Sequence, residues 1–401
     1  MRLSEVLTRT VVVYLASRFC VGTAMMMLRA AIAWHVFELT RSPFHLGLIG
    51  LVQFIPAFAL TLVAGALADT ADRRRIMMTA QLVALASGVV LCVATARGTV
   101  TLGLLYGLVV VAAIATAFDS PARMAFLPTL VGRLAFPRVA TIASTNQALA
   151  FATGPAVGGL LIADFGIAAA YAAYVVLILS ALTLLAVLPS PPAAPTGRGV
   201  SLDVIREGLH FVRRRPVILG CMTLDMFAVI FGGATALLPV YATEILHVGP
   251  RGYGLLSSAL EIGALCTSIV LITMPPIRRT GRTLLFAVAV YGLATILFGL
   301  SRSFPLSIVA YMLVGVADQV SVVMRSTTIQ LSTPDQLRGR VSAVNLLFIG
   351  ASNQLGAAES GFVAAATSAT FAVVSGGIAS LAVLAMVAWK IPELARYRID
   401  R

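Results

Sequence analysis

Charged side chains inside long apolar segments are the residues of this sequence that could do chemistry. The main candidates are Arg18, Arg29, Asp119, Arg123, Asp225, Glu261, Asp318, Arg325 and Glu359. An ionisable side chain at the depth of a bilayer is costly, so it marks a functional site by default. A buried carboxylate can take up and release a proton, because desolvation disfavours its charged form while a nearby arginine favours that form.

Proton transfer is the chemistry that the buried acids suggest. Access that alternates between the two sides of a membrane would change how water and arginine act on a carboxylate, and so would load or release a proton. We expect Asp225 or Asp318 to carry the coupled proton, with Glu261 next in line. Arg325 lies seven residues after Asp318 on the same helix face, and it could pair with Asp318 or across to another helix. Fixed structural ion pairs are the alternative.

We expect some of these charged residues, together with amide side chains, to line a substrate cavity. Amides in apolar helices can hydrogen-bond a substrate, although many of them join one helix to another. The residues expected to line the cavity are Arg29, Asn146, Asp225, Glu261, Asp318, Arg325, Asn353 and Glu359. Asp119 and Arg123 are four residues apart, and we expect a local ion pair there that takes part in conformational change.

Membrane-spanning helices are the elements that must position these residues. Of the 401 residues, 59% are hydrophobic and 11% are charged, against about 25% charged in a typical soluble protein. A helix needs about 20 apolar residues to cross a bilayer. Suitable runs lie near 11–37, 44–68, 76–96, 101–122, 139–163, 167–188, 217–243, 252–274, 284–301, 304–328, 341–363 and 367–391. They predict an all-α membrane protein with twelve transmembrane helices.

The second half of the chain repeats the first with a constant shift. The identical pairs are Arg123 and Arg325, Val139 and Val341, Gly154 and Gly356, and Gly159 and Gly361. Parallel repeats related by an axis along the membrane normal build one large class of secondary transporters, with substrate at the repeat interface. We therefore predict two pseudo-symmetric six-helix bundles, 1–188 and 217–401, joined by a cytoplasmic linker, 189–216.

The distribution of arginine predicts the orientation of these bundles. A net charge of +13 would suggest nucleic-acid binding on a soluble domain, but here the arginines lie in short connections between apolar runs. They gather in alternate connections and at the termini, so the positive-inside rule places both termini in the cytoplasm. In the linker, the helical spacing of Leu202, Ile205, Leu209 and Val212 predicts a short amphipathic helix on the inner leaflet. A linker helix with no function of its own is the alternative.

A motif after the second apolar run, at 65–75, reads GALADTADRRR. It resembles the loop between the second and third helices of the major facilitator superfamily, whose pattern is Gly-x-x-x-Asp-Arg-x-Gly-Arg-Arg. Gly65, Asp69, Arg73 and Arg74 match that pattern, whereas Thr70 stands where the superfamily usually has arginine and Asp72 where it has glycine. The resemblance implies a gating role for this loop, which holds the outward-facing state in the superfamily. Positive-inside charge alone is the alternative.

A glycine-rich motif in the fifth run consists of Gly154, Pro155, Gly158 and Gly159. Glycines three and four apart make a flat helix face, and an internal proline bends the helix. The motif resembles the Gly-Pro-x-x-Gly-Gly sequence of the antiporter branches of the same superfamily, which implies export. Close helix packing alone is the alternative.

Three further stretches, 118–131, 224–233 and 333–345, resemble the enterobactin-exporter and macrolide-efflux branch of the superfamily. The last of them holds Arg338 and Arg340, which we expect to act in gating. The resemblance implies proton-driven export of a hydrophobic or amphipathic small molecule, either a drug or a secreted metabolite such as a siderophore. We expect a monomer in the bacterial inner membrane, with no cofactor, metal, nucleic-acid partner or enzymatic activity.

Other functions stay open at this stage. An uptake symporter of the same fold is one, although the glycine-proline motif argues against it. A membrane enzyme and a non-transporting sensor are the others, but no pair of acid and base with a water site stands out, and no soluble signalling domain is recognisable. The sequence has no Walker motif GxxxxGK[ST], which argues against drive by ATP.

Overall fold

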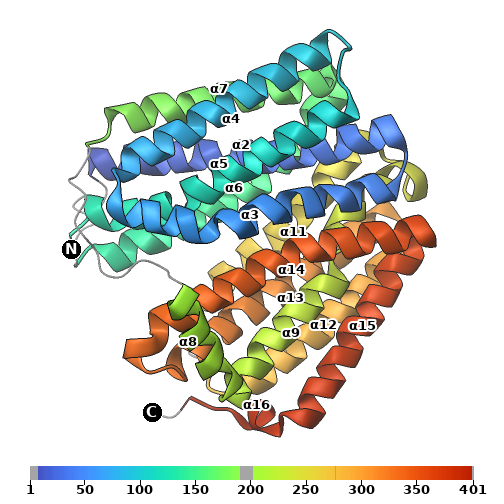
Figure 1. Ribbon diagram of the computed structural model, residues 1–401. Helices are drawn as coiled ribbons and strands as arrows, with labels where there is room; N and C mark the ends of the chain where they lie inside the picture. The colour runs from blue at the N-terminus through green and yellow to red at the C-terminus, as the bar shows by residue number, and fades with distance from the viewer. Residues whose placement is uncertain (1–7, 133, 190–201, 276, 400–401) are drawn as a thin grey trace. The chain divides into compact units, whose positions relative to one another are not determined.

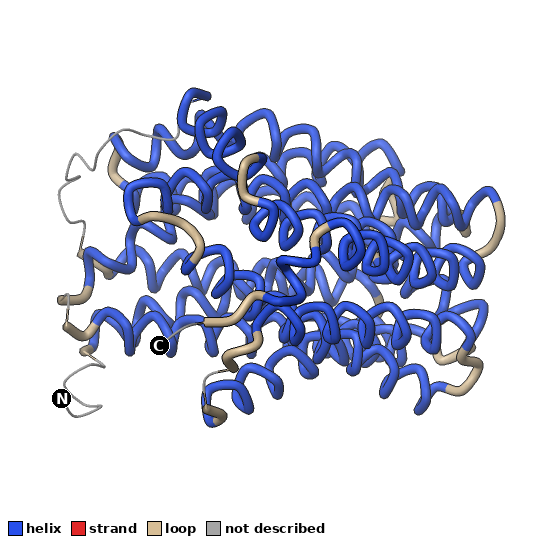
Figure 2. Tube along the Cα trace, turned by 90° about the horizontal axis from the view of Figure 1, so that it is seen from below, coloured by secondary structure: helices blue, strands red, loops and turns tan. Residues whose placement is uncertain are grey.

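A computed structural model describes residues 8–132, 134–189, 202–275 and 277–399. Within these residues the chain is helical and contains no strand, and most connections are short, as Figure 2 shows. The side chains of 57, 61–62, 65–66, 68–70 and 202–205 lie outside the description. Gly65 and Asp69 are therefore known only by their place near the end of helix α3.

The long helices alternate with short turns in both halves (Figure 1). In the first half they are α2 (Arg9–Thr40), α3 (Pro43–Thr70), α4 (Arg73–Ala96), α5 (Leu102–Leu130), α6 (Phe136–Phe165) and α7 (Ile167–Val187). In the second half they are α9 (Pro216–Gly232), α11 (Gly249–Thr273), α12 (Thr280–Leu300), α13 (Phe304–Leu331), α14 (Arg338–Ala366) and α15 (Ala369–Lys390). Two shorter helices, α8 (Leu202–Arg213) and α16 (Pro392–Arg396), flank the second set.

The predicted all-α membrane protein is confirmed. Eleven helical stretches in the described part of the chain are long and apolar enough to cross a bilayer. The expected run 341–363 is α14, which has 29 residues and so is also long enough to span. Besides Arg338, Arg340 and Glu359, it carries several amide side chains.

The seventh expected run, 217–243, differs from one continuous helix. Helix α9 ends at Gly232, and a 3-10 turn (Ala234–Leu237), a short helix α10 (Leu238–Val240) and a π turn (Tyr241–Ile245) follow. Adjacent glycines favour this break, and Pro239 lacks the N–H that would continue the helix. The Tyr291 hydroxyl donates a hydrogen bond of 3.1 Å to the Gly232 carbonyl. A broken helix in a membrane is tolerated where such partners satisfy its backbone.

Contacts divide the chain into two compact units. The first comprises Met1–Leu39 and Ile55–Ser201, and the second comprises Thr40–Phe54 and Leu202–Arg401. The start of α3 groups with the second unit because its glycines lie directly on α14. A Cβ atom at Gly50 would come within 2.6 Å of the Gln354 carbonyl oxygen, and one at Gly47 within 3.0 Å of the Gly361 Cα. The bundle boundaries 1–188 and 217–401 stay a prediction.

The glycine face of α6 packs on α2 within the first unit. A Cβ atom at Gly154 would lie 2.7 Å from the Met26 Cβ and from the Thr23 carbonyl oxygen. At Gly158 it would lie 3.1 Å from the Met27 Cγ. Gly159 and Pro155 are buried in the same helix. Close packing is therefore one role of the glycine-proline motif, and its part in gating stays a prediction.

Gly154→Leu is expected to destabilise the protein by about 1–3 kcal/mol, because overpacking forces the backbones of α2 and α6 apart. The loss should appear as a lower melting temperature of the purified protein in detergent. Gly107→Leu is the matched control, since nothing lies within 4 Å of a Cβ atom at that helical glycine. Equal melting temperatures for the two variants would contradict the tight α2–α6 contact.

Candidate proton-coupling and binding residues

A buried ion pair joins α9 to α13. The Arg325 Nη1 donates a hydrogen bond to the Asp225 Oδ2, and these side chains are only 2% and 7% exposed. The same nitrogen lies 3.5 Å from the Oδ1 of Asn345 on α14. Of the two pairings that the sequence allows for Arg325, the structure has the one between helices.

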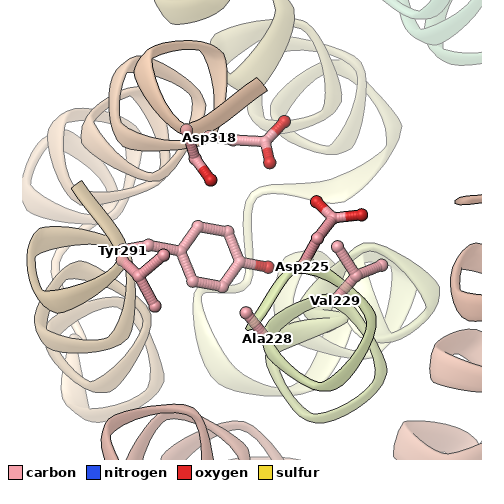
Figure 3. A pocket seen from close by; sticks show the side chains of 7 residues that line it. Asp225, Ala228, Val229, Tyr291 and Asp318 are labelled. Atoms are coloured by element: carbon pink, nitrogen blue, oxygen red, sulfur yellow. The ribbon is translucent and has the colours of Figure 1, made fainter. Parts of the chain in front are cut away.

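Asp318 lies beside this pair without joining it. It projects from α13 into a small cavity whose lining residues are Asp225, Ala228, Val229, Val288, Tyr291, Asp318 and Ser321. Figure 3 shows the carboxyl groups of Asp225 and Asp318 on the same cavity, with the Tyr291 ring extending toward α9. Among the described residues, no hydrogen bond or ion pair reaches the half-buried Asp318 carboxylate. Arg325 thus pairs directly with Asp225, whereas its charge acts on Asp318 without an ion-pair contact.

Close packing of α11 on α13 brings a third acid toward this cavity. Cβ atoms built at Gly263 and Gly315 would collide with the Met312 and Leu260 carbonyl groups, so the two backbones touch. Glu261 follows Leu260 directly, and its charge acts on Asp318. The three residues predicted for proton coupling, Asp225, Asp318 and Glu261, therefore gather in the second unit.

Tyr291 of α12 is a residue that sequence reasoning missed. Its ring fills the space beside Gly232, where a Cβ atom would meet the Tyr291 hydroxyl at 2.6 Å. The hydroxyl both caps the broken end of α9 and lines the Asp318 cavity. An isolated tyrosine in an apolar run gives no periodic signal, and only the Gly232–Gly233 pair indicates that a large neighbour can approach there.

The expected local pair of Asp119 and Arg123 is confirmed in the first unit. It is bidentate, with the Arg123 Nε and Nη2 each 2.8 Å from a carboxylate oxygen of Asp119. The Tyr14 hydroxyl donates to the Arg123 backbone carbonyl at 3.1 Å. The Asp119–Arg123 pair lies within α5, and the Tyr14 hydrogen bond links this part of α5 to α2.

The remaining cavity candidates are spread over both units. Asn146 of α6 donates to the Leu15 carbonyl of α2 at 2.9 Å, so it joins two helices. Arg29 is exposed on α2. On α14, the Asn353 amide bonds to its own helix at the Ile349 carbonyl (2.9 Å). Glu359, on the same helix, is half-buried and accepts a 3.4 Å hydrogen bond from Ser360.

In the predicted gating region between α3 and α4, side chains bond to the backbone of α4 and of neighbouring helices. Asp72 caps α4 by accepting hydrogen bonds from the backbone N–H groups of Arg74 (2.9 Å) and Arg75 (3.4 Å), as an N-cap acid does. Arg73 is buried and donates to the Ala125 carbonyl of α5 at 3.3 Å. The Arg74 Nε donates to the Leu185 carbonyl of α7 at 3.1 Å. These arginines thus anchor α4 to neighbouring helices of the first unit.

The other gating candidates lie at the start of α14. Arg338 forms an exposed ion pair of 2.9 Å with Asp335, and Arg340 pairs with Glu207 of α8. The structure has a helix, α8, within the predicted linker. This helix rests on α14, because a Cβ atom at Gly208 would lie 2.7 Å from the Arg340 carbonyl oxygen. Its contact with the inner leaflet stays a prediction.

Residues 7–399 match the family model of transmembrane secretion effectors. The enterobactin exporters EntS of Escherichia coli O157:H7 (strain EC4115 / EHEC) and of Escherichia fergusonii are each 25% identical over 386 residues, covering 96% of this chain and 92% of theirs.

Solved structures share the fold at low sequence identity. A POT family transporter in complex with 5-aminolevulinic acid has a TM-score of 0.74 at 11% identity, covering 96% of both chains. A bacterial homolog of the human lysosomal transporter Spinster has a TM-score of 0.67 at 15% identity, covering 97% of both. These likenesses establish the fold. The match over nearly the whole chain shows more: this multi-pass membrane protein is a transporter, not an enzyme, and belongs to the transmembrane secretion effector family of the major facilitator superfamily.

Proposed function

We propose that this transporter exports a hydrophobic or amphipathic small molecule in exchange for protons, by alternating access between two six-helix bundles. The observation that carries the proposal is the Asp318 carboxylate, which lines a cavity beside the Asp225–Arg325 ion pair and has no described ion-pair partner of its own. An unpaired carboxylate at membrane depth is expected to bind a proton whenever water leaves its surroundings.

The net charge of the cluster formed by Asp225, Asp318 and Arg325 indicates how binding of a proton would act on the transport cycle. With Asp318 protonated, Asp225 and Arg325 balance each other and the cluster is neutral. With Asp318 ionised, the cluster carries one excess negative charge, which is costly in apolar surroundings. The neutral state therefore favours a closed cavity and the charged state favours a hydrated one. That difference couples proton loading to access.

The relatives support a proposal for the class of substrate. The EntS proteins are named as exporters of enterobactin, and a secreted metabolite of that kind, a siderophore, is the substrate class that we propose first. A drug is the second. Uptake by symport is the competing function, since transporters of the same fold differ in direction.

The direction of proton movement separates antiport from symport. Proteoliposomes would hold the pH dye pyranine, with the membrane potential clamped by potassium and valinomycin, and enterobactin would be added outside. Antiport predicts that enterobactin entering down its gradient drives protons out, so the internal pH rises. Internal acidification would contradict the proposal and favour symport. Protein-free liposomes control for leak of the compound.

Location and assembly are part of the same proposal. We propose a monomer in the bacterial inner membrane with both termini in the cytoplasm, which the bias of arginine toward alternate connections supports. Fusions of alkaline phosphatase and of green fluorescent protein to the C-terminus test the orientation. Fluorescence without phosphatase activity is expected, and the reverse would contradict it.

A further inference from the structure

Arg18 of α2 is a cation in the first unit whose partner is neutral. Its Nη2 donates to the Oε1 of Gln147 on α6, and within the described part of the chain it forms no ion pair. Its Nε is buried and has no hydrogen-bond partner there. A guanidinium at this depth is expensive to keep charged and cannot readily lose its proton. The Gln147 amide is neutral, so the positive charge of Arg18 is left without a negative partner.

The neighbouring charged residues do not neutralise Arg18. Arg18 lies one turn beyond Tyr14 on α2, and the Tyr14 hydroxyl donates to the Arg123 backbone carbonyl, so both arginines neighbour one phenol. Asp119 is already committed to Arg123 through both of its oxygens. The cluster of Arg18, Tyr14, Asp119 and Arg123 therefore carries a net charge of one positive unit. Arg123 also keeps a buried Nη1 without a partner among the described residues.

The surroundings of Arg18 suit an aromatic acid. Gln147 and Phe151 are four residues apart on α6, so they share a helix face. Gly22 lies one turn beyond Arg18 on α2, and a Cβ atom there would be 3.8 Å from the Phe151 ring. The guanidinium of Arg18, the amide of Gln147 and the ring of Phe151 thus lie along the contact between α2 and α6. A guanidinium binds a carboxylate in a strong, charge-assisted geometry.

We infer that Arg18, together with Gln147 and Phe151, binds the anionic group of the transported molecule, which is an aromatic organic acid or phenolate. This inference rests on the proposed function and narrows its substrate class. Arg18 is half-buried, so the guanidinium is within reach of a ligand. The bound anion would supply the charge that Gln147 does not.

Equilibrium binding of radiolabelled 2-naphthoate to the full chain tests this site. The protein would be held in nanodiscs of phosphatidylcholine, with 2-naphthalenemethanol as the uncharged competitor of the same ring. Wild type should bind the acid saturably and prefer it to the alcohol. Arg18→Gln should weaken binding of the acid by about tenfold or more, because a hydrogen bond to a charged group is lost. Arg18→Lys should keep the preference for the acid with a smaller loss of affinity.

Arg97→Gln is the matched control, since Arg97 is an exposed arginine at the end of α4, and its binding should equal that of wild type. Unchanged binding by Arg18→Gln would overturn the inference, as would equal competition by acid and alcohol in wild type. The second result does not require any variant to fold. A lipid phosphate offers the same chemistry, so the assay is repeated with phosphatidylglycerol nanodiscs. Retained 2-naphthoate binding supports a substrate site, and its loss assigns Arg18 to lipid.

The binding assay is independent of proton coupling. If the acid preference depends on Arg18 while pyranine reports no proton movement, the proposed coupling fails and the anion site stands. If pyranine reports proton movement while the acid preference does not depend on Arg18, the anion site fails and the proposed coupling stands.

Discussion

Asp318→Asn is expected to reduce substrate-driven proton movement in the pyranine assay to background, while the protein still folds in the membrane. The asparagine amide keeps the size of the carboxyl group but cannot bind a proton. It also leaves the Asp225–Arg325 pair neutral in every state, so nothing would then link access to the pH on either side. Internal alkalinisation should therefore disappear upon addition of enterobactin.

The control for Asp318→Asn is Glu393→Gln, which removes an acid from the exposed face of α16 and should leave proton movement at the wild-type rate. Binding of enterobactin to Asp318→Asn, measured without a gradient, shows whether the defect lies in coupling. Proton movement that survives in Asp318→Asn would exclude Asp318 as the carrier. Glu261→Gln would then be the next variant to test, because the charge of Glu261 acts on Asp318.

The fold follows from the sequence because each helix must satisfy its backbone within itself in a membrane. Long apolar runs such as 139–163 and 167–188 correspond to α6 and α7 with small shifts at their ends. The break at Gly232 was not predicted. Its cause is tertiary, since α9 stops where the Tyr291 hydroxyl of α12 meets its carbonyl, and hydropathy alone does not report such a partner.

The candidate site was predictable in its residue types and less so in its contacts. A buried carboxylate is conspicuous in an apolar run, so Asp225, Asp318 and Glu261 could be named directly. Their unequal roles could not, because the arginine that neutralises Asp225 is 100 residues away. Arg325 also lies seven residues after Asp318, a spacing that suits an ion pair between those two residues on one helix equally well. Only the packing of α9 on α13 decides between the two acids.

The internal repeat misleads in the same way. Arg123 and Arg325 hold equivalent positions in their halves, yet Arg123 pairs within its own helix at 2.8 Å whereas Arg325 pairs across to α9. The residue that the repeat aligns with Asp119 is Ser321, which lines the Asp318 cavity. Loss of the local acid frees Arg325 to neutralise a different helix. The second unit thereby gains an ion pair between helices where the first unit has one within a helix.

Arg325→Gln is expected to lower the free energy of unfolding by about 3–5 kcal/mol, the usual cost of leaving one member of a buried pair unpaired. Arg325 is 2% exposed and Asp225 is 7% exposed, so little water can compensate for the lost charge. Asn345, with its Oδ1 at 3.5 Å from the Arg325 Nη1, has no charge to offer Asp225. The loss should appear as a large drop in melting temperature and in the monodisperse fraction.

The double variant Asp225→Asn with Arg325→Gln should recover most of that stability, because two neutral amides leave no uncompensated charge between α9 and α13. Arg338→Gln is the control, since its ion pair with Asp335 has side chains 50% and 85% exposed and should cost about 0–1 kcal/mol. A double variant as unstable as Arg325→Gln would show that Arg325 stabilises the second unit by packing. The cost of Arg325→Gln would then report lost contacts of the long side chain, and not the uncompensated charge of Asp225.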